Sequence, residues 1–319
     1  MKRVVYCCEK QTIHDLRIIN LLEVDYKVDV IELINPDTLK NLDFSTVYYM
    51  QFISPTSLDV EKLPIKTHKK TLLTMGYDLN EHSRIDLHHR VMYKNFSEAS
   101  LVVIDNPVLS REVNQNFAYE GPVLFMPYGC QIQNFKNLSS PNKNVLGTNR
   151  SMSSIHNNSM ILEAIALLEP TSYERFVFVQ HGPESNKFMS RHENLLRTIP
   201  HEYMRGGNDD VTLRFLSKID FYISASKSDG SSVSMLEAMS AGKICIVTNN
   251  ETNRYWIKDG ENGFCFDYNK YELSRKITEA LSLSAEEKKR ISLNAQLKVE
   301  NEANWDKNSK KFLEIVQAV

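Results

Sequence analysis

The sequence predicts an α/β protein made of two doubly wound domains, each with a parallel β-sheet, that face a central cleft. The chain has 319 residues, a length that suits about two domains. Short apolar runs alternate with segments of helix length, which is typical of strand–helix–strand units. A polar stretch at residues 131–144 interrupts this alternation and is interpreted as a linker.

The first domain is expected over residues 1–130. Its segments between strands carry helical spacing, as at Leu16, Ile19 and Leu22. The expected strands are residues 4–7, 28–31, 47–50, 71–75, 101–104 and 123–126.

The second domain is expected over residues 145–300, with further strands and helices in alternation. Residues 301–319 are expected to form a C-terminal helix that packs back toward the first domain. Asp209 and Asp210 are interpreted as N-cap residues of a helix. The expected strands are residues 145–147, 176–179, 221–223 and 244–247, and the expected helices lie near 159–168, 211–216 and 232–241.

Composition excludes several classes of protein. Hydrophobic residues make up 42% and charged residues 24%, so a mainly disordered chain is excluded. The net charge of −2 gives no long-range attraction for nucleic acid, and we expect no such partner. Five cysteines without a CxxC pair indicate free thiols in a reducing compartment. No apolar run approaches the ~20 residues that span a bilayer, so we expect a cytoplasmic protein. Peripheral contact at the inner face of a membrane is kept as an alternative.

The most informative stretch is SDGSSVSMLEAMSAGK at residues 228–243. A strand ends before it, and a helix is expected to begin at Ser231 or Ser232 and to end at Gly242. The first N–H groups of a helix have no intrahelical partner, and the helix dipole favours negative charge there. Gly230 would let a ligand approach the backbone closely. The pattern therefore indicates an anion site.

Two carboxylates flank this helix start. Glu237 lies about one and a half turns into the helix and could accept hydrogen bonds from a ribose, and Asp229 could take hydroxyls on the other side. A ribose, a diphosphate and a sugar would suit that arrangement, which is a nucleotide-sugar. The alternative is that one of the two serines is a simple N-cap and Glu237 an exposed helix residue.

Two familiar nucleotide motifs are absent. Gly242 and Lys243 end a helix instead of starting one, so they do not form a P-loop. Residues 1–75 contain no glycine, so the first strand is not followed by GxGxxG. A dehydrogenase is therefore disfavoured.

The stretch around Asp229 and Glu237 resembles the signature of retaining glycosyltransferases of family 4. That family has two acidic residues with seven positions between them, in a Glu-Gly…Leu-Glu-Ala-Met context; here Asp replaces the first Glu. The resemblance continues through NRYWI at residues 253–257 and DGENGF at residues 259–264. Other similar segments are MGYD at 75–78, PYG at 127–129, TNR at 148–150 and QHGP at 180–183. The resemblance implies the GT-B fold, in which two Rossmann-like domains face a cleft.

Site residues follow from the resemblance. Arg150, Asp229 and Glu237 are the expected catalytic set: Arg150 on the diphosphate, Asp229 on the donor sugar and Glu237 on the ribose. The family usually has a lysine five residues after the arginine, where this chain has Ile155. Candidates for donor binding are Gly182, Lys227, Gly230, Ser231, Ser232, Val233, Ser234 and Arg254. The alternative for Arg150 is an arginine of a surface loop.

The first domain should hold the acceptor. His14 and Asp15 begin its first helix and are acceptor-side candidates, together with Gly76 and Asp78 of the MGYD turn. A structural role for His14 is an equal alternative. The basic run at residues 66–70 could meet anionic head groups, although a solvated strand start is favoured.

The leading hypothesis is a retaining hexosyltransferase that uses a nucleotide-sugar donor and a glycan or lipid-linked acceptor in surface polysaccharide or glycoconjugate biosynthesis. By the resemblance, neither a metal nor another cofactor is expected. A sugar-nucleotide epimerase or hydrolase of the same fold is the alternative. A non-catalytic member that only binds sugar nucleotide is the third hypothesis.

Overall fold

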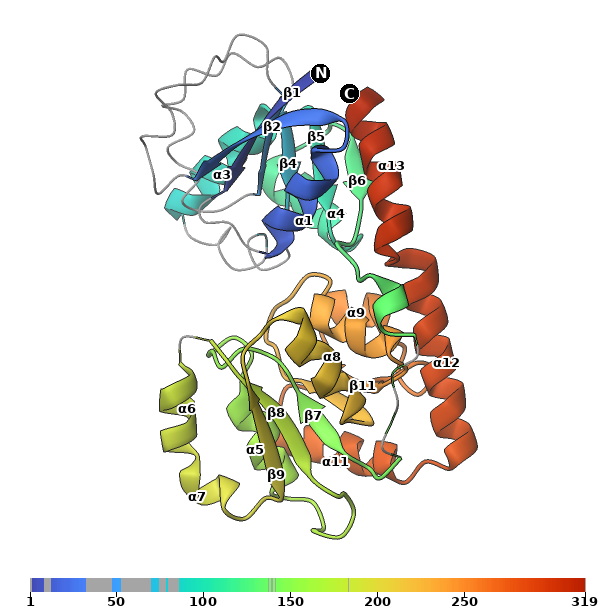
Figure 1. Cartoon of the computed structure of the whole chain (residues 1–319). Helices are drawn as coiled ribbons and strands as arrows, with labels where there is room; N and C mark the ends of the chain where they lie inside the picture. The colour runs from blue at the N-terminus through green and yellow to red at the C-terminus, as the bar shows by residue number, and fades with distance from the viewer. Residues whose placement is uncertain are drawn as a thin grey trace. The chain divides into compact units, whose positions relative to one another are not determined.

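The computed structural model describes residues 2–8, 13–32, 48–52, 70–74, 79, 86–136, 138, 140, 142–182 and 184–318. The chain divides into two compact units, Met1–Tyr128 with Asp306–Val319, and Gly129–Trp305 (Figure 1). Each unit is an α/β structure around its own parallel sheet.

The sheet of the first unit has six parallel strands in the order β2-β1-β3-β4-β5-β6. The strands are β1 (Lys2–Cys8), β2 (Tyr26–Glu32), β3 (Tyr48–Phe52), β4 (Lys70–Leu73), β5 (Leu101–Ile104) and β6 (Val123–Phe125). They match the expected apolar runs where these are described; residue 47 of the third run and residue 75 of the fourth run lie outside the described residues. Short apolar runs of this kind are typical of strands in a parallel sheet.

The helices of the first unit are α1 (Ile13–Leu22), α3 (Asp86–Ser97), α4 (Leu109–Phe117) and α13 (Trp305–Ala318). Phe96 and Phe117 stack with ring centroids 4.4 Å apart in the core between α3, α4 and the sheet. α13 belongs almost entirely to this unit, although it is the last element of the chain. Its Asn308 amide donates to the Pro127 carbonyl at 3.4 Å, and its Gln317 amide donates to Asp25 at 3.0 Å.

The sheet of the second unit also has six parallel strands, in the order β12-β11-β10-β7-β8-β9. The strands are β7 (Leu146–Thr148), β8 (Phe176–Gln180), β9 (His201–Arg205), β10 (Phe221–Ser224), β11 (Ile244–Thr248) and β12 (Phe264–Phe266). Counted from β7, this is the strand order 3-2-1-4-5-6 of the Rossmann fold.

Helices pack around this second sheet. α5 contacts α7 and α11, whereas α9 contacts α12. The helices are α5 (Asn158–Ile165), α6 (Ser185–Arg191), α7 (Glu193–Leu196), α8 (Asp209–Ser217), α9 (Val233–Ser240), α10 (Glu251–Trp256), α11 (Lys270–Leu281) and α12 (Ala285–Glu302).

The start of α8 corrects one expectation. Asn208, and not Asp209 or Asp210, is the N-cap, because its side chain accepts from the Val211 N–H at 3.1 Å. The two aspartates occupy the first turn, where the helix dipole favours negative charge.

The stretch expected as a linker begins with a short 3-10 helix, η4 (Ile132–Asn134). Its far end is fixed by Asp220, whose carboxylate accepts from the backbone N–H groups of Asn142, Lys143 and Val145 at 2.9–3.0 Å. The chain therefore enters β7 at a defined position beside β10.

No helix within the described part of the chain is both long enough and apolar enough to cross a membrane. All five cysteines are free thiols.

Candidate active site

The candidate site lies where the strand order of the second sheet reverses. From β7 the chain proceeds outward through β8 and β9, and it then returns to β10 on the other side of β7. The loops after β7 and β10 therefore meet at the carboxyl ends of two neighbouring strands, which is where open α/β sheets bind ligands.

Arg150, in the loop after β7, is the centre of this site. Its Nη1 donates to the hydroxyl oxygens of Ser232 at 2.7 Å and Ser234 at 2.9 Å. Its Nη2 donates to Asp229 Oδ2 at 2.6 Å and to His156 Nδ1 at 3.0 Å. The Arg150 side chain is only 12% exposed, and that of Asp229 21%. Arg150 is thus largely enclosed and hydrogen-bonded, unlike an exposed arginine of a surface loop.

No side chain of the described residues caps the backbone N–H groups at the start of α9. Ser232 occupies the N-cap position but makes no cap hydrogen bond, because its hydroxyl accepts from Arg150. The Ser231 hydroxyl accepts from Trp256 Nε1 at 2.8 Å. Neither serine is therefore a simple N-cap, and the helix start presents its positive dipole end beside a guanidinium.

Glu237 is the fifth residue of α9 and is 9% exposed. It is not the exposed helix residue of the alternative interpretation. Gly230 and Val233 lie between Asp229 and Glu237 along the chain, Gly230 buried and Val233 half-buried.

His156 contacts Arg150; the resemblance placed it in the same segment as Arg150 but gave it no role. A guanidinium has only donors, so the ring nitrogen that faces Arg150 must accept. Burial above all, together with the charges of Arg150 and His181, lowers the pKa of His156 to about 3. The ring is therefore neutral near pH 7. Its Nδ1 also lies 3.0 Å from the Ser226 hydroxyl oxygen.

A buried tyrosine supports the two serines from below. The Tyr222 hydroxyl, on β10, donates to Ser234 Oγ at 2.9 Å. Burial raises the pKa of Tyr222, so this hydroxyl stays protonated and remains a donor. Ser234 thus accepts from both Tyr222 and Arg150.

The loop after β10 is fixed by elements that follow it. Thr248 Oγ1, at the end of β11, donates to the Ser226 carbonyl at 2.6 Å. Thr252 Oγ1, on α10, lies 2.9 Å from the Asp229 carbonyl oxygen. The backbone that carries Asp229 is therefore held in place independently of any ligand.

Gly182 supports the Arg150 loop through its backbone. Its φ is +96°, and a Cβ there would lie 3.0 Å from the Met152 nitrogen. Met152 in turn pairs its N–H with the His181 carbonyl at 2.8 Å. The glycine is needed where two loops pack closely.

The two candidates to replace the missing lysine make contacts with residues other than Arg150. Arg254 donates to the carbonyl and the side-chain oxygen of Asn249, at 3.3 and 3.1 Å. Lys227 pairs its backbone N–H with the Ile155 carbonyl, and its side chain lines a pocket beside α6. Among the described residues, His156 is the side chain with basic nitrogens that contacts Arg150. It lies one position after Ile155.

The acceptor-side candidates belong to the first unit. Asp15 is 3% exposed and accepts from the Tyr6 hydroxyl at 2.8 Å. Burial and the Asp15 carboxylate both raise the pKa of Tyr6. His14 lies in α1, and Gly76 and Asp78 lie outside the described residues.

No group of three or more His, Cys, Asp or Glu side chains is placed to hold a metal ion in the part of the chain that the structure describes. The site consists of the Arg150 guanidinium among neutral hydrogen-bonding groups. The Asp229 carboxylate and the start of α9 lie next to it. Such a site can hold an anion by charge and by directed hydrogen bonds.

The sequence matches the family model of glycosyl transferases group 1 over residues 131–298, which is more than half of the chain. The chain therefore belongs to this family. A comparison with curated proteins finds no match.

Solved structures share the fold at low sequence identity. HepE from Anabaena in complex with UDP has a TM-score of 0.78 at 15% identity, with 100% of both chains covered. Sucrose-phosphate synthase from Thermosynechococcus elongatus has a TM-score of 0.83 at 10% identity, covering 100% of this chain and 99% of that one. A TarM variant from S. aureus has a TM-score of 0.72 at 13% identity. The match covers 84% of this chain, which spans about half (55%) of the TarM chain. The fold is GT-B, and the protein is a glycosyltransferase of that fold.

Proposed function

We propose that this protein is a retaining hexosyltransferase that needs no metal. It moves a hexose-type sugar from a nucleotide-sugar to a glycan or lipid-linked acceptor in surface polysaccharide or glycoconjugate biosynthesis.

The observation that carries the proposal is the environment of Arg150. Two serine hydroxyls at the start of α9 hold one side of the guanidinium, and Asp229 and His156 occupy the other. A diphosphate that arrives at this helix start would replace Asp229 as the partner of Arg150, because it offers more charge and more acceptor oxygens. The serines would keep the guanidinium in place during this exchange.

Once released, Asp229 can accept hydrogen bonds from the hydroxyls of the donor sugar. Glu237, one and a half turns into α9, would accept from the ribose. Phosphate, sugar and ribose contacts would then come from the loops after β7 and β10 and from α9.

In the proposed reaction the bond between the anomeric carbon and the phosphate oxygen breaks. An acceptor hydroxyl oxygen bonds to the same carbon from the same face, and its proton passes to the departing phosphate. Arg150 stabilises the negative charge that develops on the leaving diphosphate. In this scheme the guanidinium supplies the charge that a metal ion would otherwise supply.

The solved relatives suggest where to begin with donors. HepE was crystallised with UDP-glucose, and TarM with UDP and alpha-GlcNAc-glycerol. UDP-sugars are therefore the first donors to test here, and simple glycosides the first acceptors.

The test is product analysis with UDP-glucose, UDP-GlcNAc and GDP-mannose, each with and without a panel of octyl glycosides. We expect transfer that retains the anomeric configuration, detected by NMR, and a loss of at least a hundredfold in Arg150→Ala. Arg290→Ala, which removes an exposed arginine of α12, should leave the rate unchanged. An altered sugar nucleotide or free sugar formed equally well without acceptor would favour the epimerase or hydrolase, and an inverted product would contradict the proposal.

A further inference from the structure

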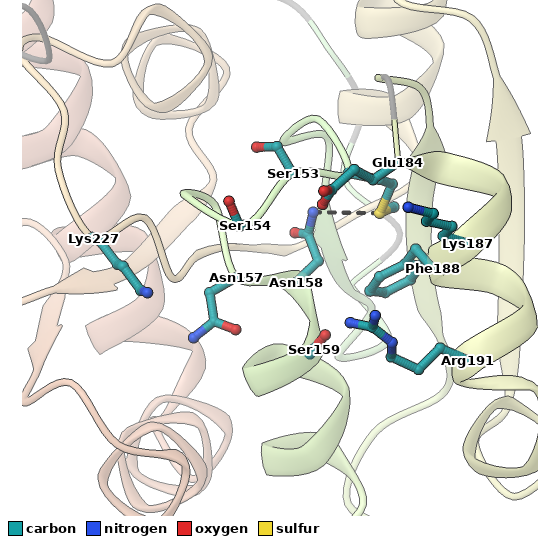
Figure 2. A pocket seen from close by; sticks show the side chains of 11 residues that line it. Ser153, Ser154, Asn157, Asn158, Ser159, Glu184, Lys187, Phe188, Arg191 and Lys227 are labelled. Carbon is teal, nitrogen blue, oxygen red and sulfur yellow. Dashed lines mark hydrogen bonds between the residues drawn. The ribbon is translucent and has the colours of Figure 1, made fainter.

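A second polar pocket lies beside the loop that carries Arg150. Its volume is about 330 Å³, and we call it the α5–α6 pocket. It is lined by the loop before α5, by α6 and by Lys227 of the loop after β10 (Figure 2).

Three cationic side chains from two parts of the chain line this pocket. Lys187 and Arg191 come from α6, one turn apart, and Lys227 lies across from them (Figure 2). None of the three forms an ion pair within the described residues, although most other cations of this unit do. The pocket has a single carboxylate, that of Glu184. Unpaired like charges around a concave site attract an ion of the opposite sign.

The floor of the pocket adds a polar atom without a partner. Asn158 is 3% exposed, and its Oδ1 accepts no hydrogen bond. Its Nδ2 donates to the carbonyl oxygens of Arg150 at 3.2 Å and Ser151 at 3.0 Å, which fixes the amide orientation. The unpaired atom is therefore the acceptor oxygen, and a buried acceptor without a donor is unfavourable. A ligand hydroxyl would satisfy it.

The start of α5 forms the same floor. Its N-cap residue, Asn157, makes no cap hydrogen bond, and its amide nitrogen donates to the Tyr268 hydroxyl at 2.6 Å. The backbone donors of the first turn therefore add to the positive character of the pocket.

We propose that the α5–α6 pocket binds the phosphoryl group of a phosphorylated sugar or polyol. The cations hold the phosphoryl oxygens, and a neighbouring hydroxyl of the ligand donates to Asn158.

This site is separate from the proposed donor site. The Arg150 side chain turns toward α9, where it meets Ser232 and Ser234, while its backbone carbonyl faces Asn158. The two sites thus share one loop but not one set of side chains.

The test is calorimetric titration of the full chain with sn-glycerol 3-phosphate, inorganic phosphate and glycerol at constant ionic strength. We expect glycerol 3-phosphate to bind more tightly than phosphate and glycerol not to bind. Lys187→Ala with Arg191→Ala should weaken glycerol 3-phosphate binding by about tenfold or more, since two charged hydrogen-bond donors are lost. The matched control, Lys289→Ala with Lys310→Ala, removes two exposed helical lysines and should change nothing.

A variant that should gain affinity distinguishes a local effect on binding from general damage to the fold. Glu184→Gln removes the only carboxylate of the pocket and should tighten glycerol 3-phosphate binding severalfold. UDP binding is measured in parallel and should be the same in all these variants. A failure of the donor-site proposal can then be told apart from a failure of the proposal for the α5–α6 pocket. The proposal is overturned if wild-type protein does not bind glycerol 3-phosphate, or if Arg150→Ala abolishes binding while Lys187→Ala with Arg191→Ala does not.

Discussion

At the scale of single residues, the site is built around the guanidinium of Arg150. Most of the residues that contact it are held in place by further hydrogen bonds. Ser234 is oriented by Tyr222, and His156 lies beside Ser226, which in turn belongs to a loop fixed by Thr248. Such second contacts make the position of Arg150 independent of ligand. They predict measurable effects from residues that touch no substrate.

Tyr222→Phe tests the support below Ser234. The variant removes one buried hydrogen bond, so we expect a loss of about 1 kcal/mol in the free energy of unfolding. We also expect the dissociation constant of the donor nucleotide to rise by about threefold to tenfold, because Arg150 becomes less well placed. Urea denaturation and nucleotide titration measure the two effects. Tyr203→Phe on the edge strand β9 is the control, and equal nucleotide affinity in both variants would argue against a positioning role.

His156→Gln tests the neutral imidazole. Because the folded pKa of His156 lies near 3 and the ordinary value is 6.5, the unfolded chain binds more protons between these values. Stability therefore falls as the pH drops below about 6.5, by up to about 1.4 kcal/mol per pH unit from this group. Glutamine can still accept from Arg150 but does not titrate. The stability of the variant should depend less on pH between 6.5 and 5, and parallel curves for both proteins would contradict this.

Asp229 and Arg150 could be found from the sequence because each lies in a recognisable local pattern. No role for His156 or Tyr222 could be predicted, since their roles depend on which atoms the fold brings to Arg150. Lys227 and Arg254 were predicted to replace the missing lysine because they are cationic. The structure instead places the neutral ring of His156 against Arg150. A neutral acceptor cannot be predicted from the pattern of charged residues in the sequence.

At the scale of elements, the buried strands were predictable and the edge strands of the second sheet were not. β10 and β11 are buried throughout and read as apolar runs. β9 alternates between exposed and half-buried residues, and β12 has only three residues. α6 has no buried residue at all, so it leaves no apolar periodicity. An element that buries little apolar surface leaves little trace in the sequence.

Gly147→Ala tests the central strand β7, which carries the Arg150 loop. A Cβ at this position would lie 2.5 Å from Ile219 Cγ2 and 2.9 Å from the Val177 carbonyl oxygen. The backbone oxygen cannot move aside, so we expect destabilisation by about 1–3 kcal/mol.

Gly207→Ala is the matched control for this prediction. A Cβ at Gly207 comes no closer than 3.4 Å to its nearest neighbour, His181, which is an ordinary contact. Its urea midpoint should stay near that of the wild type. Equal midpoints for the two glycine variants would contradict the packing argument.

At the scale of the whole molecule, the two units differ in how much function their sequences reveal. The family match and the Arg150 site both lie within Gly129–Trp305. In the proposed function, donor recognition would use a helix start and a few fixed polar groups, and such groups leave local motifs. Acceptor recognition would depend on the first unit, where Asp15 is engaged by Tyr6 and the MGYD turn lies outside the described residues.

The central claim is that this site binds a nucleoside diphosphate through Arg150 and Glu237. The most direct measurement is thermal stability with UDP, GDP, ADP, CDP and NAD, for wild-type protein and Glu237→Ala. A ligand at a hundred times its dissociation constant adds about 2.7 kcal/mol of stability, which raises Tm by several degrees. The account predicts such a rise with one nucleoside diphosphate and its loss in Glu237→Ala. A rise with NAD alone, or a nucleotide effect that Glu237→Ala leaves intact, would contradict it.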